Sequence, residues 1–186
     1  FGHPREEDGT TGHPDLTESA VSGGWHVYLV DGSETVSSLD YEPVVAEGVD
    51  ESQHGWLPIS AAWMLDPEAL PVHLSPHGPS DWERVQAEPV PHDLRGPVGW
   101  VRQQIGLTGT MDRVPELPRT ELPEVEVTDI RQDRTSISFT VSQPGVPVLV
   151  KTSYFPNWKA SGADGPYRVT PNLMVVIPKG THVSLH

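Results

Sequence analysis

Histidines are the residues of this sequence whose spacing comes nearest to that of a metal site. His73 and His77 are four residues apart, which on a helix would place both rings on one face. Three prolines between residues 71 and 79 argue against a helix there, so we interpret the pair as part of a solvated loop. His182 and His186 would share a strand face, and we expect both to be exposed. The sequence therefore predicts no metal site and no cofactor.

Carboxylates are abundant, but no motif marks a catalytic pair among them. The sequence has no Gly-x-Ser-x-Gly, no glycine-rich phosphate loop and no His-Glu-x-x-His. Glu83 beside Trp82, or Asp164 near Trp158, could imitate a glycosidase carboxylate. Asp164-Gly165 is also what a tight turn requires, so the pattern is ambiguous. We assign no catalytic residue and leave enzymatic activity open.

Tryptophans flanked by turn or polar residues are the candidates for ligand binding. Exposed flat rings stack well on sugar faces, and Trp56, Trp82 and Trp100 are our candidate carbohydrate-binding residues. The alternative is that each tryptophan fills a core, with its indole N–H bonded to a carbonyl. We favour core packing for the individual residues, and most strongly for Trp25 and Trp158.

Composition excludes several classes of protein. The chain has no cysteine, which removes disulfides, cysteine–zinc sites and thiol nucleophiles. Its net charge of −14 and its few lysines argue against a nucleic-acid partner and against adsorption to anionic lipid. No apolar run approaches the roughly 20 residues of a membrane span. Because the chain opens at Phe1 rather than at a methionine, we interpret it as a fragment of a longer protein.

The elements that must position these residues are mostly strands. Between Val146 and Leu185 apolar residues alternate and are interrupted by Gly, Pro and Asn, which is typical of antiparallel strands. Asp164-Gly165 is the strongest hairpin signal in the chain. Trp25–Val30 predicts another strand, and residues 36–45 a further extended run.

The expected fold is mainly β, in four parts. A flexible lead-in over residues 1–24 precedes an α+β portion over 25–114, with one to two turns of helix within 59–70. Prolines at positions 115, 118 and 123 predict an extended connector over 115–124. Residues 125–186 then form an antiparallel, β-sandwich-like (jelly-roll-like) module.

Three motifs carry a resemblance to a known family. Tyr154-Phe-Pro-Asn-Trp158, Asp164-Gly165 and the segment from Pro178 to Val183 together resemble the C-terminal extracytoplasmic part of YfhO-like bacterial membrane proteins. The strand from Trp25 and the run that ends at Val45 are also similar to this family. The overlap covers both ends of the chain, about half of it, and the middle is unmatched; the Arg-rich, Lys-poor style looks actinobacterial.

The resemblance implies a role outside the cytoplasmic membrane. Such a parent is a multi-spanning, glycosyltransferase-like protein, and this chain would be its soluble accessory domain. The expected partners are cell-envelope glycan and the membrane-embedded part of the same polypeptide, with no nucleic acid. The alternatives are a purely structural or protein-interaction β domain and a carboxylate-dependent glycan hydrolase.

Overall fold

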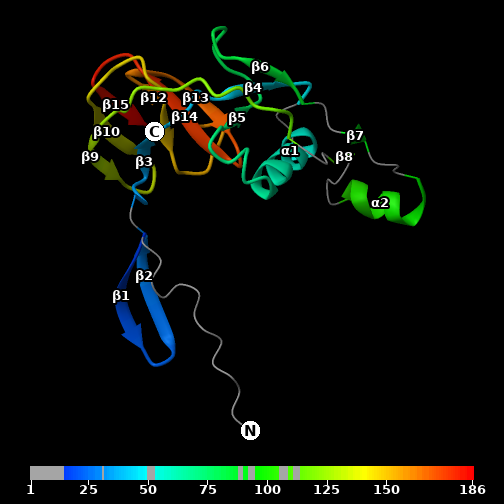
Figure 1. Ribbon diagram of the computed structural model, residues 1–186, viewed down its shortest axis with the longest axis horizontal. Helices are drawn as coiled ribbons and strands as arrows, with labels where there is room; N and C mark the ends of the chain where they lie inside the picture. Colours follow the sequence, from blue (N-terminus) through cyan, green and yellow to red (C-terminus); the bar gives the residue numbers. More distant parts are fainter. Residues whose placement is uncertain are drawn as a thin grey trace. The chain divides into compact units, whose positions relative to one another are not determined.

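The computed structural model describes residues 15–30, 32–49, 53–87, 90–91, 95–104, 109–110 and 114–186. By its contacts the chain divides into two compact units, Phe1–Glu34 and Thr35–His186. Figure 1 traces the elements of both units in sequence colours. The architecture is mainly β, as the sequence predicts.

The first unit contains a β-hairpin. Strands β1 (Leu16–Ser22) and β2 (Trp25–Val30) pair in antiparallel fashion around a Gly-Gly turn. Trp25 is 82% exposed, so the prediction that it packs into a core is wrong. A two-stranded sheet has no second layer to bury its apolar face. Because β1 lies within residues 1–24, the expected flexible lead-in contains a strand, whereas residues 1–14 lie outside the described residues.

Two four-stranded antiparallel sheets form the centre of the second unit. The first has the strand order β13-β14-β11-β3 and the second the order β12-β15-β10-β9. The strands of the first sheet are β3 (Val36–Ser38), β11 (Val148–Val150), β13 (Ala163–Val169) and β14 (Leu173–Pro178). Those of the second are β9 (Val127–Gln132), β10 (Ile137–Val141), β12 (Ala160–Ser161) and β15 (His182–Leu185).

The core between these sheets draws side chains from both of them. Val148 and Met174 from the first sheet join Phe139 and Val183 from the second in one buried cluster. Side chains on β10 alternate between buried and half-buried, as expected of a strand with one face on a core. The two inner faces therefore pack as a β-sandwich, which confirms the prediction for residues 125–186. Strand β3, from outside that range, completes the first sheet.

The first sheet is buried on its other face as well. Leu149 and Val175 point away from the sandwich core and pack with Trp82 and Val45 in a separate cluster. All three residues of β11 are consequently buried. The α+β portion thus covers the outer face of the sandwich.

The α+β portion is built on a short parallel sheet with the order β5-β4-β6. Its strands are β4 (Val44–Glu47), β5 (Leu74–Ser75) and β6 (Arg84–Gln86), and helix α1 (Gln53–Leu65) connects β4 to β5. Trp56, Ile59 and Trp63 of α1 join side chains of this sheet in a third buried cluster. Figure 1 shows α1 beside β5.

Helix α1 differs in position from the predicted helix. It begins upstream of Pro58, before the predicted range of 59–70, and is longer than the predicted one to two turns. It ends before Pro67, one of the two prolines expected to end it. Pro58 lies inside the helix, at its sixth residue, so the helix lacks the backbone hydrogen bond that an N–H at this position would donate. The remaining elements are β7 (Val90–Pro91), α2 (Gly96–Gln104) and β8 (Gly109–Thr110).

The proline-rich segment is extended and runs beside residues 40–42. Glu42 donates its N–H to the carbonyl of Thr120 at 2.9 Å, and Leu122 donates to the carbonyl of Asp40 at 2.9 Å. Leu122 packs against the sandwich core and against the cluster on the outer face of the first sheet.

The predicted hairpin at Asp164-Gly165 is wrong. Both residues lie inside β13, where Gly165 has φ +95° and the register with β14 shifts. The chain reverses instead at residues 170–172. A glycine in this conformation followed by Pro166, which has no N–H for the ladder, forms a bulge within the strand rather than its end.

The sandwich core predicts a large difference between two phenylalanines. Phe139→Ala removes a ring that is 0% exposed and should lower the free energy of unfolding by about 3–5 kcal/mol. Phe155→Ala removes a ring that is 62% exposed and should change it by no more than about 0.5 kcal/mol. Urea unfolding followed by circular dichroism measures both. Equal losses would contradict the placement of the core.

Candidate binding site

Two of the three candidate tryptophans lie in the interior. Trp56 and Trp82 are each 2% exposed, and Trp56 donates its indole N–H to the carbonyl of Pro171 at 2.8 Å. Trp82 packs against Tyr167 with ring centroids 5.2 Å apart. Neither ring offers a face to a sugar, so the structure shows the core-packing alternative for both. Trp100, on α2, is 62% exposed, and its binding role stays a prediction.

His73 has a structural role in the buried part of the α+β portion. Its ring stacks on Trp63 with centroids 5.2 Å apart, and its Nδ1 lies 2.8 Å from the carbonyl oxygen of Thr170. A carbonyl only accepts, so Nδ1 carries the proton. Burial lowers the pKa of His73, and the bond to Thr170 opposes this shift. Within the described residues, no three His, Asp or Glu side chains gather as a metal ion would require.

Acidic side chains gather near Trp82. The pKa of Glu42 is raised, first by burial and then by the negative charges of Asp81 and Glu83. Glu83 accepts a hydrogen bond from the hydroxyl of Thr120 at 3.1 Å. Asp81 and Glu83 are exposed, so these groups sit at the surface. These three carboxylates line neither of the two pockets described below, and the larger of those pockets is lined by other carboxylates, Asp66, Glu68 and Glu116.

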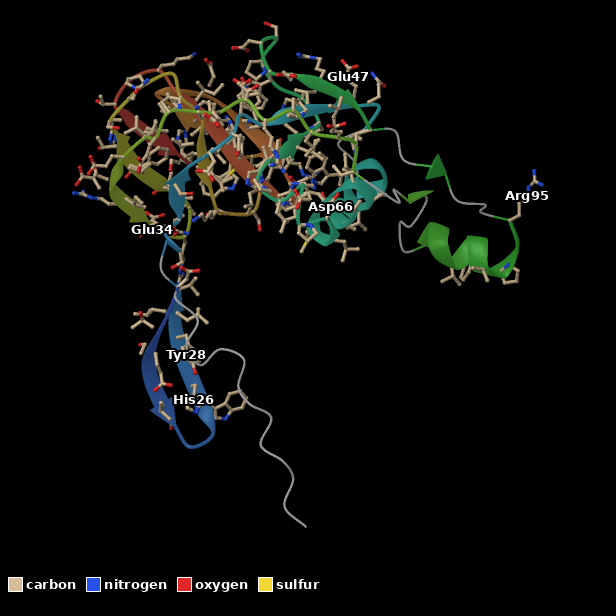
Figure 2. The ribbon with its side chains drawn as sticks, in the orientation of Figure 1. His26, Tyr28, Glu34, Glu47, Asp66 and Arg95 are labelled. Carbon is tan, nitrogen blue, oxygen red and sulfur yellow. The ribbon has the colours of Figure 1, made fainter. Side chains whose placement is uncertain are left out.

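A pocket of about 600 Å³ lies beside the segment that follows α1 and against the proline-rich connector. Asp66, just beyond the end of α1 in Figure 2, and Arg119 are among its lining residues. Arg119 donates to the carbonyl of Glu68 at 2.8 Å and lies 3.5 Å from its carboxylate. Its positive charge is therefore already balanced by a protein group.

A second pocket, of about 280 Å³, is the aromatic pocket, and it opens at one edge of the sandwich. It is lined by Thr135, Phe155, Asn157, Trp158 and His186. Phe155 is 62% exposed, and Trp158 is half-buried and packs against the sandwich core. The pocket thus has one anchored ring and one ring open to solvent.

A tight turn positions the two rings. Trp158 donates its N–H to the carbonyl of Phe155 at 3.0 Å, so these residues are the first and last of a four-residue turn. Pro156 and Asn157 occupy its centre, where both residue types are favoured. The turn brings its two ends together and leaves the Asn157 side chain at the pocket.

Backbone hydrogen bonds hold His186, which also lines the aromatic pocket. Lys159 and His186 exchange two hydrogen bonds, at 2.9 and 3.1 Å, which extend the pairing of β12 with β15. This fixes His186 next to the residue that follows Trp158. The ring of His186 is therefore presented to the pocket from a strand end rather than from a loop.

A capped loop supplies Thr135. The carboxylate of Asp133 accepts the N–H groups of Thr135 and Ser136 at 2.8 and 2.7 Å, and the hydroxyl of Ser136 at 2.9 Å. These bonds hold the pKa of Asp133 below its usual range, with the bond from Thr135 the largest contribution. The loop between β9 and β10 is thus ordered by its own side chains.

The chemistry of the aromatic pocket is that of binding. Its described side chains provide two flat apolar rings, an amide, a hydroxyl and an imidazole. None of them is a carboxylate, an ammonium or a guanidinium group. Apolar surface with a few polar groups at its edge is typical of sites for small neutral ligands.

Sequence reasoning missed this pocket because it assigned Trp158 to the core. The assignment is correct in part, since Trp158 contacts the sandwich core with one side. The signal that could have found the pocket is the Pro-Asn pair with an aromatic residue on each side, because a turn places its flanking residues next to each other. His182 and His186 are exposed, as predicted.

Comparison of the chain with known protein families, with curated proteins and with solved structures finds no match. Among the described residues, no helix has the length and apolar character needed to cross a membrane.

Burial of His73 predicts a pH dependence of stability. Its pKa in the folded protein is below the ordinary value of 6.5, so the unfolded chain binds more protons between the two values. The free energy of unfolding should therefore fall as the pH is lowered through about 6.5. We expect His73→Gln to flatten this slope in urea unfolding between pH 8 and pH 5. The matched control is His182→Gln, at an exposed position; equal slopes for the two variants would contradict the assignment.

Proposed function

We propose that this chain is a binding domain without catalytic machinery of its own. It serves as the extracytoplasmic accessory domain of a membrane-embedded, glycosyltransferase-like protein and contacts cell-envelope glycan. The observation that carries the proposal is the aromatic pocket, with its exposed Phe155, its anchored Trp158 and its polar edge.

The motif that resembles the YfhO-like proteins also supports the proposal. Tyr154-Phe-Pro-Asn-Trp158 is one of the motifs that carry that resemblance, and it builds the turn and both aromatic walls of the pocket. The ring of Phe155 is 62% exposed, so it is open to contact with a ligand. Ligand binding accounts for an aromatic residue kept at the surface.

A structural or protein-interaction role is the second candidate, and exposed apolar residues on α1 favour it. Leu57, Met64 and Leu65 are 47%, 60% and 84% exposed. Groups of exposed apolar side chains mark surfaces that other proteins cover. The membrane-embedded part of the same polypeptide is the expected partner for this face, and the two roles are compatible.

Titration of the whole chain with cell-wall oligosaccharides tests glycan binding. We expect chemical-shift changes at Phe155, Asn157 and the Trp158 indole, with a dissociation constant on the order of 1 mM, which corresponds to about −4 kcal/mol. Trp100→Ala separates the two sites under consideration. If this variant loses binding while Phe155→Ala retains it, the site is on α2; no response to any glycan would leave only the structural role.

A further inference from the structure

The aromatic pocket has room for one sugar ring. Its volume of about 280 Å³ falls just below the range of about 300–1,000 Å³ that accommodates drug-sized ligands. The pocket is open to solvent beside Phe155, so the remainder of a longer ligand can continue outside it. Recognition at this site therefore concerns a single residue of a glycan.

The walls of the aromatic pocket favour a sugar ring that has two apolar faces and polar groups around its edge. The C–H bonds of a pyranose with equatorial hydroxyls point along the ring axis, so both faces are apolar and can lie on an aromatic ring. An axial hydroxyl makes one of the two faces polar, and that face would lose its water without a partner if it lay on Phe155 or Trp158. The flat rings of the pocket thus select for equatorial substitution.

The polar groups at the edge of the pocket match hydroxyls. The amide of Asn157 both donates and accepts, the hydroxyl of Thr135, which donates to Asp133, can still accept, and the imidazole of His186 has two ring nitrogens that can form hydrogen bonds. A sugar hydroxyl also donates and accepts, so each can pair with such a group. An aliphatic ligand would form no hydrogen bond with these groups.

The charges around the pocket disfavour an anion. None of the five lining side chains is a lysine or an arginine that could bind a carboxylate or phosphate. The chain as a whole carries a net charge of −14, which repels an anionic ligand at low ionic strength. The preferred ligand is therefore neutral.

We propose that the aromatic pocket binds one neutral pyranose residue with equatorial hydroxyls, and that it discriminates against axial epimers and uronic acids. This inference rests on the proposed glycan-binding function and names the class of sugar. Phe155 and Trp158 supply the stacking surfaces, and Asn157 supplies the main hydrogen-bonding group.

NMR titration of the whole chain with four small probes tests the selection. The probes are methyl β-D-glucopyranoside, its galacto epimer with one axial hydroxyl, glucuronic acid at neutral pH, and cyclohexanol as an aliphatic ring of similar size. We expect the glucoside to shift the Phe155 and Trp158 signals and to bind about 3- to 10-fold tighter than each other probe. Equal or tighter binding of the galacto epimer, glucuronic acid or cyclohexanol would overturn the inference.

Two substitutions test the roles within the pocket. Phe155→Leu keeps an apolar side chain but removes the flat ring, and it should weaken glucoside binding about 2- to 10-fold. Asn157→Asp keeps the size and turn preference but removes the amide donor, and it should weaken binding similarly. Leu29→Ala, at a side chain on β2 that is 60% exposed, is the matched control and should bind as wild type does.

The outcomes separate this inference from the proposed function. If longer glycans bind but shift signals away from Phe155 and Trp158, the domain binds glycan and the pocket assignment is wrong. If Phe155→Leu binds the glucoside as tightly as wild type, stacking is not the basis of recognition. If none of the glycans or monosaccharides binds, both proposals fall.

Discussion

Burial of one sheet on both of its faces is the constraint on which the rest of the second unit depends. Val148 and Val150 point into the sandwich core, whereas Leu149, between them on β11, points into the cluster formed with Trp82. Residues on a strand alternate between faces, so three consecutive apolar residues serve two cores. Strand β11 therefore joins the sandwich to the α+β portion without a linker between them.

The turn after β13 stabilises the packing of the α+β portion on the first sheet through hydrogen bonds. The carbonyl of Pro171 accepts hydrogen bonds from the indole of Trp56 at 2.8 Å and from the hydroxyl of Ser60 at 3.0 Å. Thr170 bonds to His73 and exchanges two further bonds with Leu74. Buried polar groups of this kind are costly unless they are paired, so the turn fixes where α1 and β5 must sit.

The aromatic pocket lies at an edge of the sandwich, and none of the residues in these hydrogen bonds lines it. Its turn, its strand end and its capped loop are each ordered by local hydrogen bonds, and none depends on a bound ligand. Trp158 is rigid because it packs on the core, whereas Phe155 contributes its ring at the surface. A site whose walls are set before binding loses little conformational freedom when a ligand arrives.

The sequence by itself determined the mainly β class and the strands of the closing segment, because alternation and turn residues are local signals. It did not determine the bulge at Gly165, the exposure of Trp25 or the interior place of Trp56 and Trp82, since each depends on which layer covers which face. The aromatic pocket combines a loop after β9, a turn before β12 and the end of β15. Only the tertiary structure brings these segments together, because strand pairing joins residues that no local pattern connects.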